Sequence, residues 1–412
     1  MFDPGIGAMR PPFPTIQQDI QVSFRYPVHF TRDLFAVSNP LVRNLVAQDN
    51  PGPPAKLLVV LDRGVQRCHP RLLSRIEAYC RHHHTVVTLA AAPLLFEGGE
   101  QLKNDPLHVK IVQQAIHTYG LCRHSYVAAI GGGALIDMAG FAAATAHRGL
   151  RLIRVPTTVM AQADAAIGVK NGINAFGKKN FIGTFAPPVA VLNDADFLPT
   201  LSPRDWIGGV AEAVKVALLK DSDFFTFLEK YADALAHRDL DLMNQVIYRS
   251  AVLHLNHIAQ GGDPFESGSS RPLDFGHWAA HKLEHLSAYA LGHGQAVALG
   301  LALDSTYARL IGLLPPSLWQ RILTTLRTLG FALYDPRMEA DHSLLDGLKE
   351  FQEHLGGRLT IMLLWDIGQG LEVHDLNGDL VRESLALLKK TAAVPPGYTP
   401  HRRDARATNL PF

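Results

Sequence analysis

Three consecutive glycines, Gly131, Gly132 and Gly133, are the residues best suited to bind a phosphate in this chain. A short apolar run at 126–130 precedes them, and a helical pattern of small residues at 134–146 follows. A strand, a glycine turn and a helix in this order present free backbone N–H groups and a positive helix end to an anion. Glycine allows the backbone to approach the ligand closely. The pattern therefore predicts a phosphate-binding turn.

Polar side chains punctuate the apolar sequence around this turn. Packing alone gives no reason for so many of them in a stretch typical of alternating strands and helices. The carboxyl ends of parallel strands are where such sheets bind ligands, and Asp62 and the segment 97–103 follow two earlier strand-like runs. The candidates after the turn are Asp137, Arg148, Thr157, Thr158, Asp164, Lys170, Lys179 and Asn180.

One carboxylate and several histidines in the second half of the chain could bind a metal ion. His277, His281 and His285 recur every four residues, so they would lie along one side of a helix, and His293 follows between two glycines. One carboxylate and two imidazoles leave an open position on zinc, as a catalytic site requires. Glu212, His277 and His293 could provide that set. The alternative, a surface stripe of histidines, fits His285 better than His277, which has apolar neighbours.

The composition excludes several classes of protein. Of 412 residues, 47% are hydrophobic and 19% charged, which is enough for a large core and argues against global disorder. A formal net charge of +1 gives no electrostatic reason to expect nucleic acid or an anionic membrane surface as a partner. No apolar run reaches 18 residues, so we expect no membrane-spanning helix. Three cysteines make a disulfide framework improbable and favour a reducing, cytoplasmic setting.

Strand and helix patterns alternate in the first half of the chain. This alternation predicts an α/β fold with a doubly wound, mostly parallel sheet. We expect strands at 19–30, 56–62, 85–90, 126–130 and 150–155, and helices at 71–83, 106–119 and 134–146.

The pattern changes near Ser202, where a capping residue, a proline and an acidic residue mark the start of a helix. Helical patterns dominate from there, apart from a strand signal at 359–365, so we expect an all-α second domain. The predicted organisation is a flexible arm at 1–18, an α/β domain at 19–201, a helical domain at 202–390 and a disordered tail at 391–412.

Seven segments, taken together and in order, resemble the sugar phosphate cyclases, the superfamily of 3-dehydroquinate synthase. The resemblance covers roughly residues 56–390 and includes His281 and His293. The segments are 99–103 (GEQLK), 131–137 (GGGALID), 148–151 (RGLR), 155–158 (VPTT), 177–183 (GKKNFIG), 211–215 (AEAVK) and 275–277 (FGH). The resemblance implies a dehydroquinate synthase-like fold, with an α/β domain that binds NAD and a helical domain that binds the metal.

The resemblance also implies a role for each matching residue. The residues expected to bind NAD are Asp62, Glu100 and Lys103 at the adenosine half, Gly132, Gly133 and Asp137 at the pyrophosphate and ribose, and Thr157, Thr158, Asp164, Lys179 and Asn180 near the nicotinamide. The expected zinc ligands are Glu212, His277 and His293. The residues expected to face the substrate are Arg148, Lys170, Lys215, Arg271, Asp274 and His281.

The activity that the resemblance implies suits these residue types. Such enzymes oxidise a sugar alcohol, eliminate phosphate, reduce the ketone again and close a carbocycle by aldol addition. NAD takes and returns hydride, zinc acidifies the hydroxyl and polarises the ketone, and lysine and arginine match the phosphate and enolate charge. We therefore expect a homodimer that acts on a small phosphorylated sugar, with NAD and Zn²⁺ as cofactors.

The chain departs from the dehydroquinate synthase pattern at positions that would bind a substrate carboxylate. Lysines of that pattern are replaced by Asn256 and His354, an asparagine is replaced by Asp274, and an arginine is shifted by one residue to Arg271. These changes point to the branches that make cyclitols without a carboxylate, such as the epi-valiolone synthase group.

Three alternatives remain open from the sequence. The first is 3-dehydroquinate synthase itself. The second is a metal-dependent polyol or glycerol dehydrogenase, which shares the two-domain plan and the glycine turn but has less need for so many cations. The third is an inactive NAD-binding partner protein, against which the intact metal set argues. Net production of NADH would distinguish a dehydrogenase from a cyclase.

Overall fold

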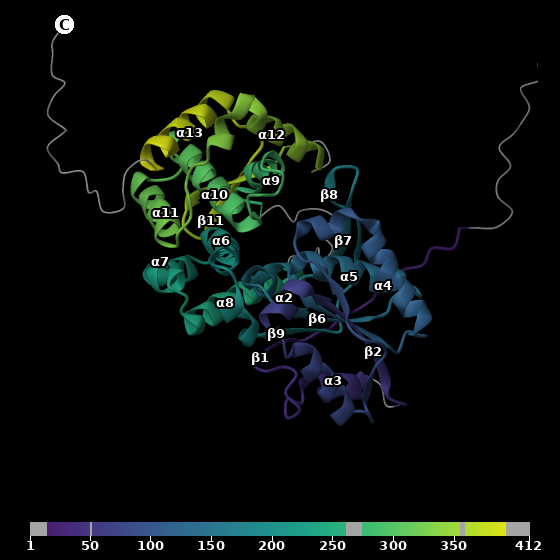
Figure 1. The fold of residues 1–412 in the computed structure, drawn as a ribbon. Helices are drawn as coiled ribbons and strands as arrows, with labels where there is room; N and C mark the ends of the chain where they lie inside the picture. Colours follow the sequence, from purple (N-terminus) through teal and green to yellow (C-terminus); the bar gives the residue numbers. More distant parts are fainter. Residues whose placement is uncertain (1–14, 50–51, 261–273, 355–358, 393–412) are drawn as a thin grey trace, which may run out of the picture.

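Seven parallel strands form one sheet in the first half of the chain (Figure 1). The computed structural model describes residues 15–49, 52–260, 274–354 and 359–392. The strand order is β1-β9-β6-β5-β2-β3, and β4 also pairs with β2. The strands are β1 (Val28–Thr31), β2 (Ala55–Asp62), β3 (Val87–Leu89), β4 (Leu94–Phe96), β5 (Tyr126–Gly131), β6 (Arg151–Pro156) and β9 (Ala190–Asp194).

Helices cover both faces of this sheet, as the doubly wound prediction requires. One face packs in a core with residues of α4 and α5, and the other in a core with residues of α1 and α3. All six residues of β5 are buried, which explains why its sequence is a continuous apolar run. The helices are α1 (Leu41–Asp49), α2 (Arg63–Cys68), α3 (Leu72–His82), α4 (Pro106–Thr118) and α5 (Gly133–Thr145), with short turns η1 (Glu100–Asn104), η2 (Ala161–Ala165) and η3 (Ala195–Thr200).

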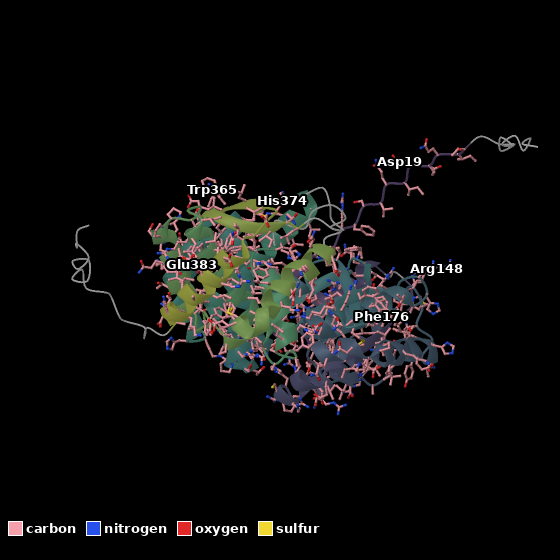
Figure 2. The ribbon with its side chains drawn as sticks, turned by 90° about the horizontal axis from the view of Figure 1, so that it is seen from above. Asp19, Arg148, Phe176, Trp365, His374 and Glu383 are labelled. Atoms are coloured by element: carbon pink, nitrogen blue, oxygen red, sulfur yellow. The ribbon has the colours of Figure 1, made fainter. Side chains whose placement is uncertain are left out.

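Two parts of this half differ from the sequence prediction. The strand expected at 19–30 is limited to β1, which begins at Val28, and the segment before it exposes Ile20 and Val22. Figure 2 shows Asp19 on a segment that projects from the body of the molecule. A second, antiparallel hairpin, β7 (Lys170–Ala175) with β8 (Lys178–Phe185), was not predicted.

Helices dominate from Ser202 onward, where the predicted cap forms: the Ser202 hydroxyl accepts a hydrogen bond from the Asp205 N–H at 3.1 Å. The region is mainly helical, as expected, but not all-α: the strand signal at 359–365 corresponds to β10 (Ile361–Asp366), which pairs with β11 (Gln369–Val373) in an antiparallel hairpin against α6 and α10. The helices are α6 (Pro203–Lys220), α7 (Ser222–Ala236), α8 (Leu240–Gln260), α9 (His277–Leu286), α10 (His293–Leu310), α11 (Pro316–Thr328), η5 (Pro336–His342), α12 (Ser343–His354) and α13 (Gly378–Ala392).

The sheet half and the helical half share core residues. Val159 and Ala163, which follow β6, pack in the core of the helical half, and Ala251 of α8 packs in a core of the sheet half. This shared core holds the carboxyl edge of the sheet against α6 and α8. Within the described residues, no helix combines the length and apolar character needed to span a bilayer.

Candidate active site between the sheet and the helices

Glu212, His277 and His293 converge from three different helices. Glu212 lies within α6, while His277 and His293 are the first residues of α9 and α10. One carboxylate oxygen of Glu212 lies 3.1 Å from Nε2 of His293 and 3.4 Å from Nε2 of His277. The three ligand atoms lie within 4.8 Å of one another. Tetrahedral zinc with bonds of about 2.0–2.1 Å separates its ligand atoms by about 3.4 Å, so the geometry fits a metal ion.

The outer nitrogen of each imidazole supports the same interpretation. Nδ1 of His277 lies 3.2 Å from the carbonyl oxygen of Phe275, and Nδ1 of His293 lies 3.1 Å from Oε2 of Glu284. Both partners are acceptors suited to an Nδ1–H donor, and Nε2 of each ring faces the Glu212 oxygen, where its lone pair could bind a metal ion. Metal-ligating histidines are held in this way in other proteins. The residues present therefore fit the zinc ion that the sequence predicted.

Close backbone contacts between glycines bring the three helices together. A Cβ atom on Gly294 would lie 1.9 Å from the carbonyl oxygen of Gly208, so α10 and α6 pack with no space for a side chain. A Cβ on Gly300 would lie 2.0 Å from the carbonyl oxygen of Gly276, and this contact joins α10 to α9. Both contacts lie beside metal ligands in the sequence, which explains how residues distant in the chain reach one site.

Lys215 is buried beside the metal ligands and is surrounded by carboxylates. Its Nζ atom lies 2.6 Å from Oε2 of Glu212. Burial would lower the pKa of Lys215, but Glu212, then Asp164 and Asp274, hold it above the usual value. Burial would likewise raise the pKa of Glu212, but Lys215 and the neighbouring imidazoles hold it well below the usual value. The site therefore keeps an ionised carboxylate and a charged ammonium group together.

The structure adds a second histidine and carboxylate pair that the sequence did not predict. Nδ1 of His254, on α8, lies 2.6 Å from Oδ1 of Asp164, on the π-helical turn η2. Burial would raise the pKa of Asp164, but His254 outweighs this and lowers it. Nothing in the spacing of these residues signalled the pair, because 90 positions separate them. Asp164 was expected near the nicotinamide, and it lies between His254 and the charges of Glu212 and Lys215.

His281 lies at the solvent-exposed rim of the metal site. Its ring stacks on that of His293 with centroids 6.1 Å apart and approaches that of His277 edge-on at 5.4 Å. His281 belongs to no group of three ligand atoms among the described residues. Its position at the rim fits the expected role of facing the substrate. His285 is exposed on the same helix, as the surface-histidine alternative predicted.

The glycine turn forms the start of α5 at the carboxyl edge of the sheet. Gly132 is the N-cap of α5 and no side chain caps this end, so the first N–H groups of the helix are available to an anion. Thr157 and Thr158 follow β6 beside it: the N–H of Thr157 donates to the carbonyl oxygen of Gly131, and the Thr158 hydroxyl accepts from Ala161.

A buried lysine, Lys103, contacts three other expected cofactor residues. Nζ of Lys103 lies 2.7 Å from Asp137 and 3.6 Å from Glu100, and it also contacts the side-chain oxygen of Asn180. Burial raises the pKa of Asp137, and Lys103 offsets part of that rise. The backbone N–H of Asn180 donates to Asn174, a bridging residue that the sequence did not predict. The cluster links η1, α5 and β8 into one wall of the site.

Asp62 ends β2 at the same edge of the sheet, where β2 pairs with β4. One of its oxygens accepts a hydrogen bond from the N–H of Gly64 at 2.7 Å and caps α2. A Cβ on Gly98 would lie 2.0 Å from the other oxygen, so the chain passes very close to this carboxylate. Asp62 therefore lies at the carboxyl edge of the sheet, and its contact with the adenosine half of NAD stays a prediction.

Arg148, Arg271 and Lys170 were also expected to face the substrate, and the structure describes Arg148 and Lys170. Arg148 is exposed in the turn between α5 and β6, with a φ of 66°, at the amino edge of the sheet. The 13 residues of α5 separate this turn from the glycine turn, about 20 Å at 1.5 Å per residue, so within one chain Arg148 lies far from the glycine turn, and its role facing the substrate stays a prediction. Figure 2 shows Arg148 on the outer surface of the sheet half. Arg271 lies outside the described residues.

Lys170 begins β7 with an exposed side chain, and a buried arginine holds the loop before it. The guanidinium of Arg154, in β6, donates to the carbonyl oxygens of Ala166, Gly168 and Lys170. Burial lowers the pKa of Arg154 to about 10. Arg154 therefore fixes the segment between Asp164 and Lys170, a role that its position within an apolar strand did not reveal.

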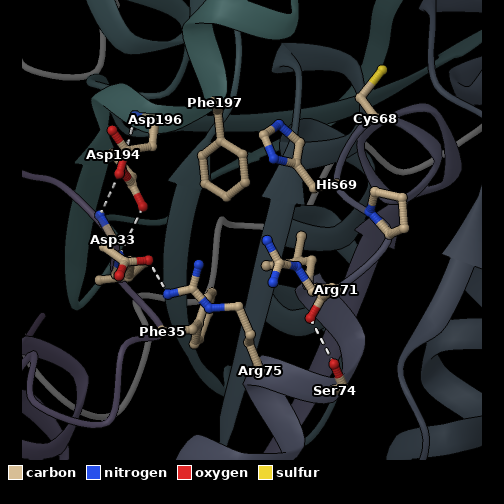
Figure 3. A pocket seen from close by; sticks show the side chains of 13 residues that line it. Asp33, Phe35, Cys68, His69, Arg71, Ser74, Arg75, Asp194, Asp196 and Phe197 are labelled. Carbon is tan, nitrogen blue, oxygen red and sulfur yellow. Dashed lines mark hydrogen bonds and ion pairs between the residues drawn. The ribbon is translucent and has the colours of Figure 1, made fainter.

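A separate hollow lies at the ends of β1 and β9 (Figure 3). Several of its charged groups are paired within the chain: Asp194 accepts hydrogen bonds from Leu34 and Asp196, and Arg75 pairs with Asp33. It contains none of the predicted site residues, so the active-site assignment does not depend on it.

Comparison with known proteins supports the same assignment. The 3-dehydroquinate synthase N-terminal family model matches residues 93–208, and the C-terminal model matches residues 209–347. A 3-dehydroquinate synthase of Cereibacter sphaeroides is 35% identical over 72% of this chain and 81% of its own length. A 3-dehydroquinate synthase of Nitrosococcus oceani is 31% identical over 90% of this chain and 98% of its own length.

A solved structure is also similar along nearly the whole chain. It is the 2-epi-5-epi-valiolone synthase of Streptomyces hygroscopicus subsp. jinggangensis 5008 with NAD⁺ and Zn²⁺ bound. The similarity has a TM-score of 0.81 and 28% identity, and it covers 91% of this chain and 100% of that one. The chain therefore belongs to the 3-dehydroquinate synthase family, within the sugar phosphate cyclase superfamily.

Proposed function

We propose that this protein is an NAD- and zinc-dependent cyclase that converts a phosphorylated ketose to a carbocycle and releases phosphate. The observation that carries the proposal is the convergence of Glu212, His277 and His293 with Lys215, at the edge of the sheet that presents Gly132. The relatives and the solved neighbour support the same chemistry and the same two cofactors.

Each part of the site has a distinct task in this proposal. When bound, NAD supplies a reversible hydride acceptor and the zinc ion polarises the reacting hydroxyl and carbonyl oxygens. The N–H groups after Gly132 would hold the pyrophosphate. Lys215 would face the oxygen on which negative charge develops, because it stays protonated beside Glu212. Asp164 and His254 would exchange a proton with the substrate at the inner wall.

We propose a substrate without a carboxylate. A substrate carboxylate would need a cation as its partner. Lys215 is such a cation, but it already lies among the negative charges of Glu212, Asp164 and Asp274. Asn256 offers an uncharged amide on α8. Loss of a charge-assisted hydrogen bond costs about 1.5–3 kcal/mol, which is roughly tenfold to over a hundredfold in binding. His354, whose side chain lies outside the described structure, stays a sequence prediction.

A kinetic comparison of two substrates tests this proposal. We expect kcat/KM to be higher for sedoheptulose 7-phosphate than for the carboxylated substrate of 3-dehydroquinate synthase. The variant Asp274→Asn removes one negative charge and should raise kcat/KM for the carboxylated substrate relative to the parent protein. Efficient conversion of the carboxylated substrate to dehydroquinate, with no activity on sedoheptulose 7-phosphate, would assign the protein to the alternative, 3-dehydroquinate synthase itself.

We also propose a homodimer, because Arg148 could face the substrate only if a second copy brought it there. Mixing of two inactive variants, Arg148→Ala and His277→Ala, tests this. Partial recovery of phosphate release after subunit exchange supports an active site shared between copies. Monomeric sedimentation of the active protein rejects it.

A further inference from the structure

Glu284 makes two contacts that cross from the metal site to the cofactor side of the molecule. Its side chain is 5% exposed on α9. One carboxylate oxygen lies 3.1 Å from Nδ1 of His293, and the other lies 2.8 Å from Nζ of Lys179. His293 is a metal ligand, whereas Lys179 lies on β8 beside the expected cofactor residue Asn180. A single carboxylate therefore bridges the two binding sites.

The two contacts use both oxygens of Glu284. Burial would lower the pKa of Lys179, but Glu284 raises it. Lys179 also lies 5.5 Å from the centre of the Tyr289 ring, just beyond the end of α9. Three charged or polar groups are thus fixed in one chain of contacts.

We propose that Glu284 is a positioning residue that makes metal binding and NAD binding favour each other. This inference rests on the proposed function, which supplies the two ligands. A cation bound at Nε2 of His293 would withdraw electron density from the ring. The hydrogen bond that Nδ1–H donates to Glu284 would then become stronger. The fixed carboxylate then holds Lys179, and with it the β7–β8 hairpin, where the nicotinamide end of NAD is expected. By thermodynamic reciprocity, NAD must raise the affinity for the metal by the same factor.

Binding measurements without turnover test the coupling. The dissociation constant of NAD is measured by calorimetry for the metal-free protein and for the protein at saturating Zn²⁺. We expect zinc to tighten NAD binding in the parent at least about fivefold, the lower end of typical coupling. In Glu284→Gln the ratio of the NAD dissociation constants without and with Zn²⁺ should fall close to one. Each of the two donors needs an acceptor oxygen, and the glutamine amide offers only one. Its zinc affinity should fall about tenfold to a hundredfold.

Two further variants separate coupling from a general loss of structure. Lys179→Met should also lose the coupling, while its zinc affinity stays within about threefold of the parent, since His293 keeps its carboxylate. Glu350→Gln is the matched control, because it removes the partner of Lys282 on the same helix α9 and should keep the full coupling ratio.

The outcomes distinguish this inference from the proposed function. NAD binding that zinc leaves unchanged in the parent overturns the coupling but leaves the cyclase proposal intact. An unchanged coupling ratio in Glu284→Gln, at zinc concentrations that saturate this variant, overturns the role of Glu284. A parent protein that binds neither ligand overturns the proposed function and the coupling with it.

Discussion

Gly294 packs so closely against Gly208 that a Cβ atom on Gly294 would lie 1.9 Å from the Gly208 carbonyl oxygen. This contact fixes the distance between α10 and α6, and His293 and Glu212 lie one residue and one helical turn away from it. The metal site therefore depends on the absence of side chains at the helix crossing as well as on its three ligands.

Substitution of that glycine should damage both stability and metal binding. Gly294→Ala forces α10 away from α6, and we expect a loss of about 1–3 kcal/mol in the free energy of unfolding, as for other overpacked cores. Zinc content should fall in the same variant. Gly378→Ala is the control, since a Cβ there meets its nearest neighbour at an ordinary 3.6 Å. Normal zinc content in Gly294→Ala would show that the crossing does not set the ligand geometry.

Removal of a ligand should empty the metal site. His277→Ala leaves one imidazole and one carboxylate, and metal content measured by atomic spectroscopy should fall well below one equivalent per chain. His285→Ala, on the exposed side of the same helix, should retain the parent value. A stoichiometric metal content in His277→Ala would mean that the ligand set is wrong.

A side chain at Gly132 should block NAD without unfolding the protein. A Cβ at this position would meet Thr158 no closer than 3.5 Å, so the folded chain has room for it. The bound pyrophosphate would lose that space, because its oxygens need close access to the helix N–H groups. We expect Gly132→Val to bind NAD far more weakly at an unchanged melting temperature. Equal NAD affinity in the variant and the parent would remove this assignment.

Asp304 should make stability depend on pH near neutrality. It is 1% exposed, and it accepts hydrogen bonds from the Gly276 N–H and the Trp278 indole, on either side of His277. Burial raises its pKa to about 7, and these two bonds offset only part of the rise. The folded-state pKa of Asp304 lies above its unfolded value, so its ionisation destabilises the folded protein. The free energy of unfolding therefore falls as pH rises from about 4 to 7, and this loss of stability remains in full above pH 7.

The variant Asp304→Asn cannot ionise, so its stability relative to the parent should improve between pH 5 and pH 8 by on the order of 2 kcal/mol. Urea unfolding of both metal-free proteins at the two pH values measures this difference. A difference between variant and parent that stays constant with pH would show that Asp304 is ionised throughout this range.

The sequence was most informative where the local pattern and the tertiary structure agree. The alternation of apolar runs and helices identified the parallel sheet, because each buried strand such as β5 carries its signal within six residues. The candidate metal ligands were also identifiable, since a carboxylate and imidazoles in apolar surroundings need a reason to be buried.

Residues that act through distant contacts gave no such signal. His254 meets Asp164 across 90 positions, and Arg154 looks like an irregularity in an apolar strand until its three carbonyl partners are seen. Arg148 shows a different limit of the sequence: its motif matches the family, but within one chain it lies in a turn at the other edge of the sheet. The β7–β8 hairpin was missed because its polar residues indicated ligand binding more strongly than strand pairing.

The most direct test of the proposed chemistry follows phosphate and the nicotinamide absorbance in one reaction. The purified protein, loaded with Zn²⁺ and NAD, is incubated with sedoheptulose 7-phosphate. A cyclase returns the hydride in each turnover, so we expect stoichiometric inorganic phosphate, a product lighter than the substrate by one phosphoric acid, and no accumulation of NADH. Stoichiometric NADH with the phosphate still attached to the product would contradict the proposal and identify a polyol dehydrogenase.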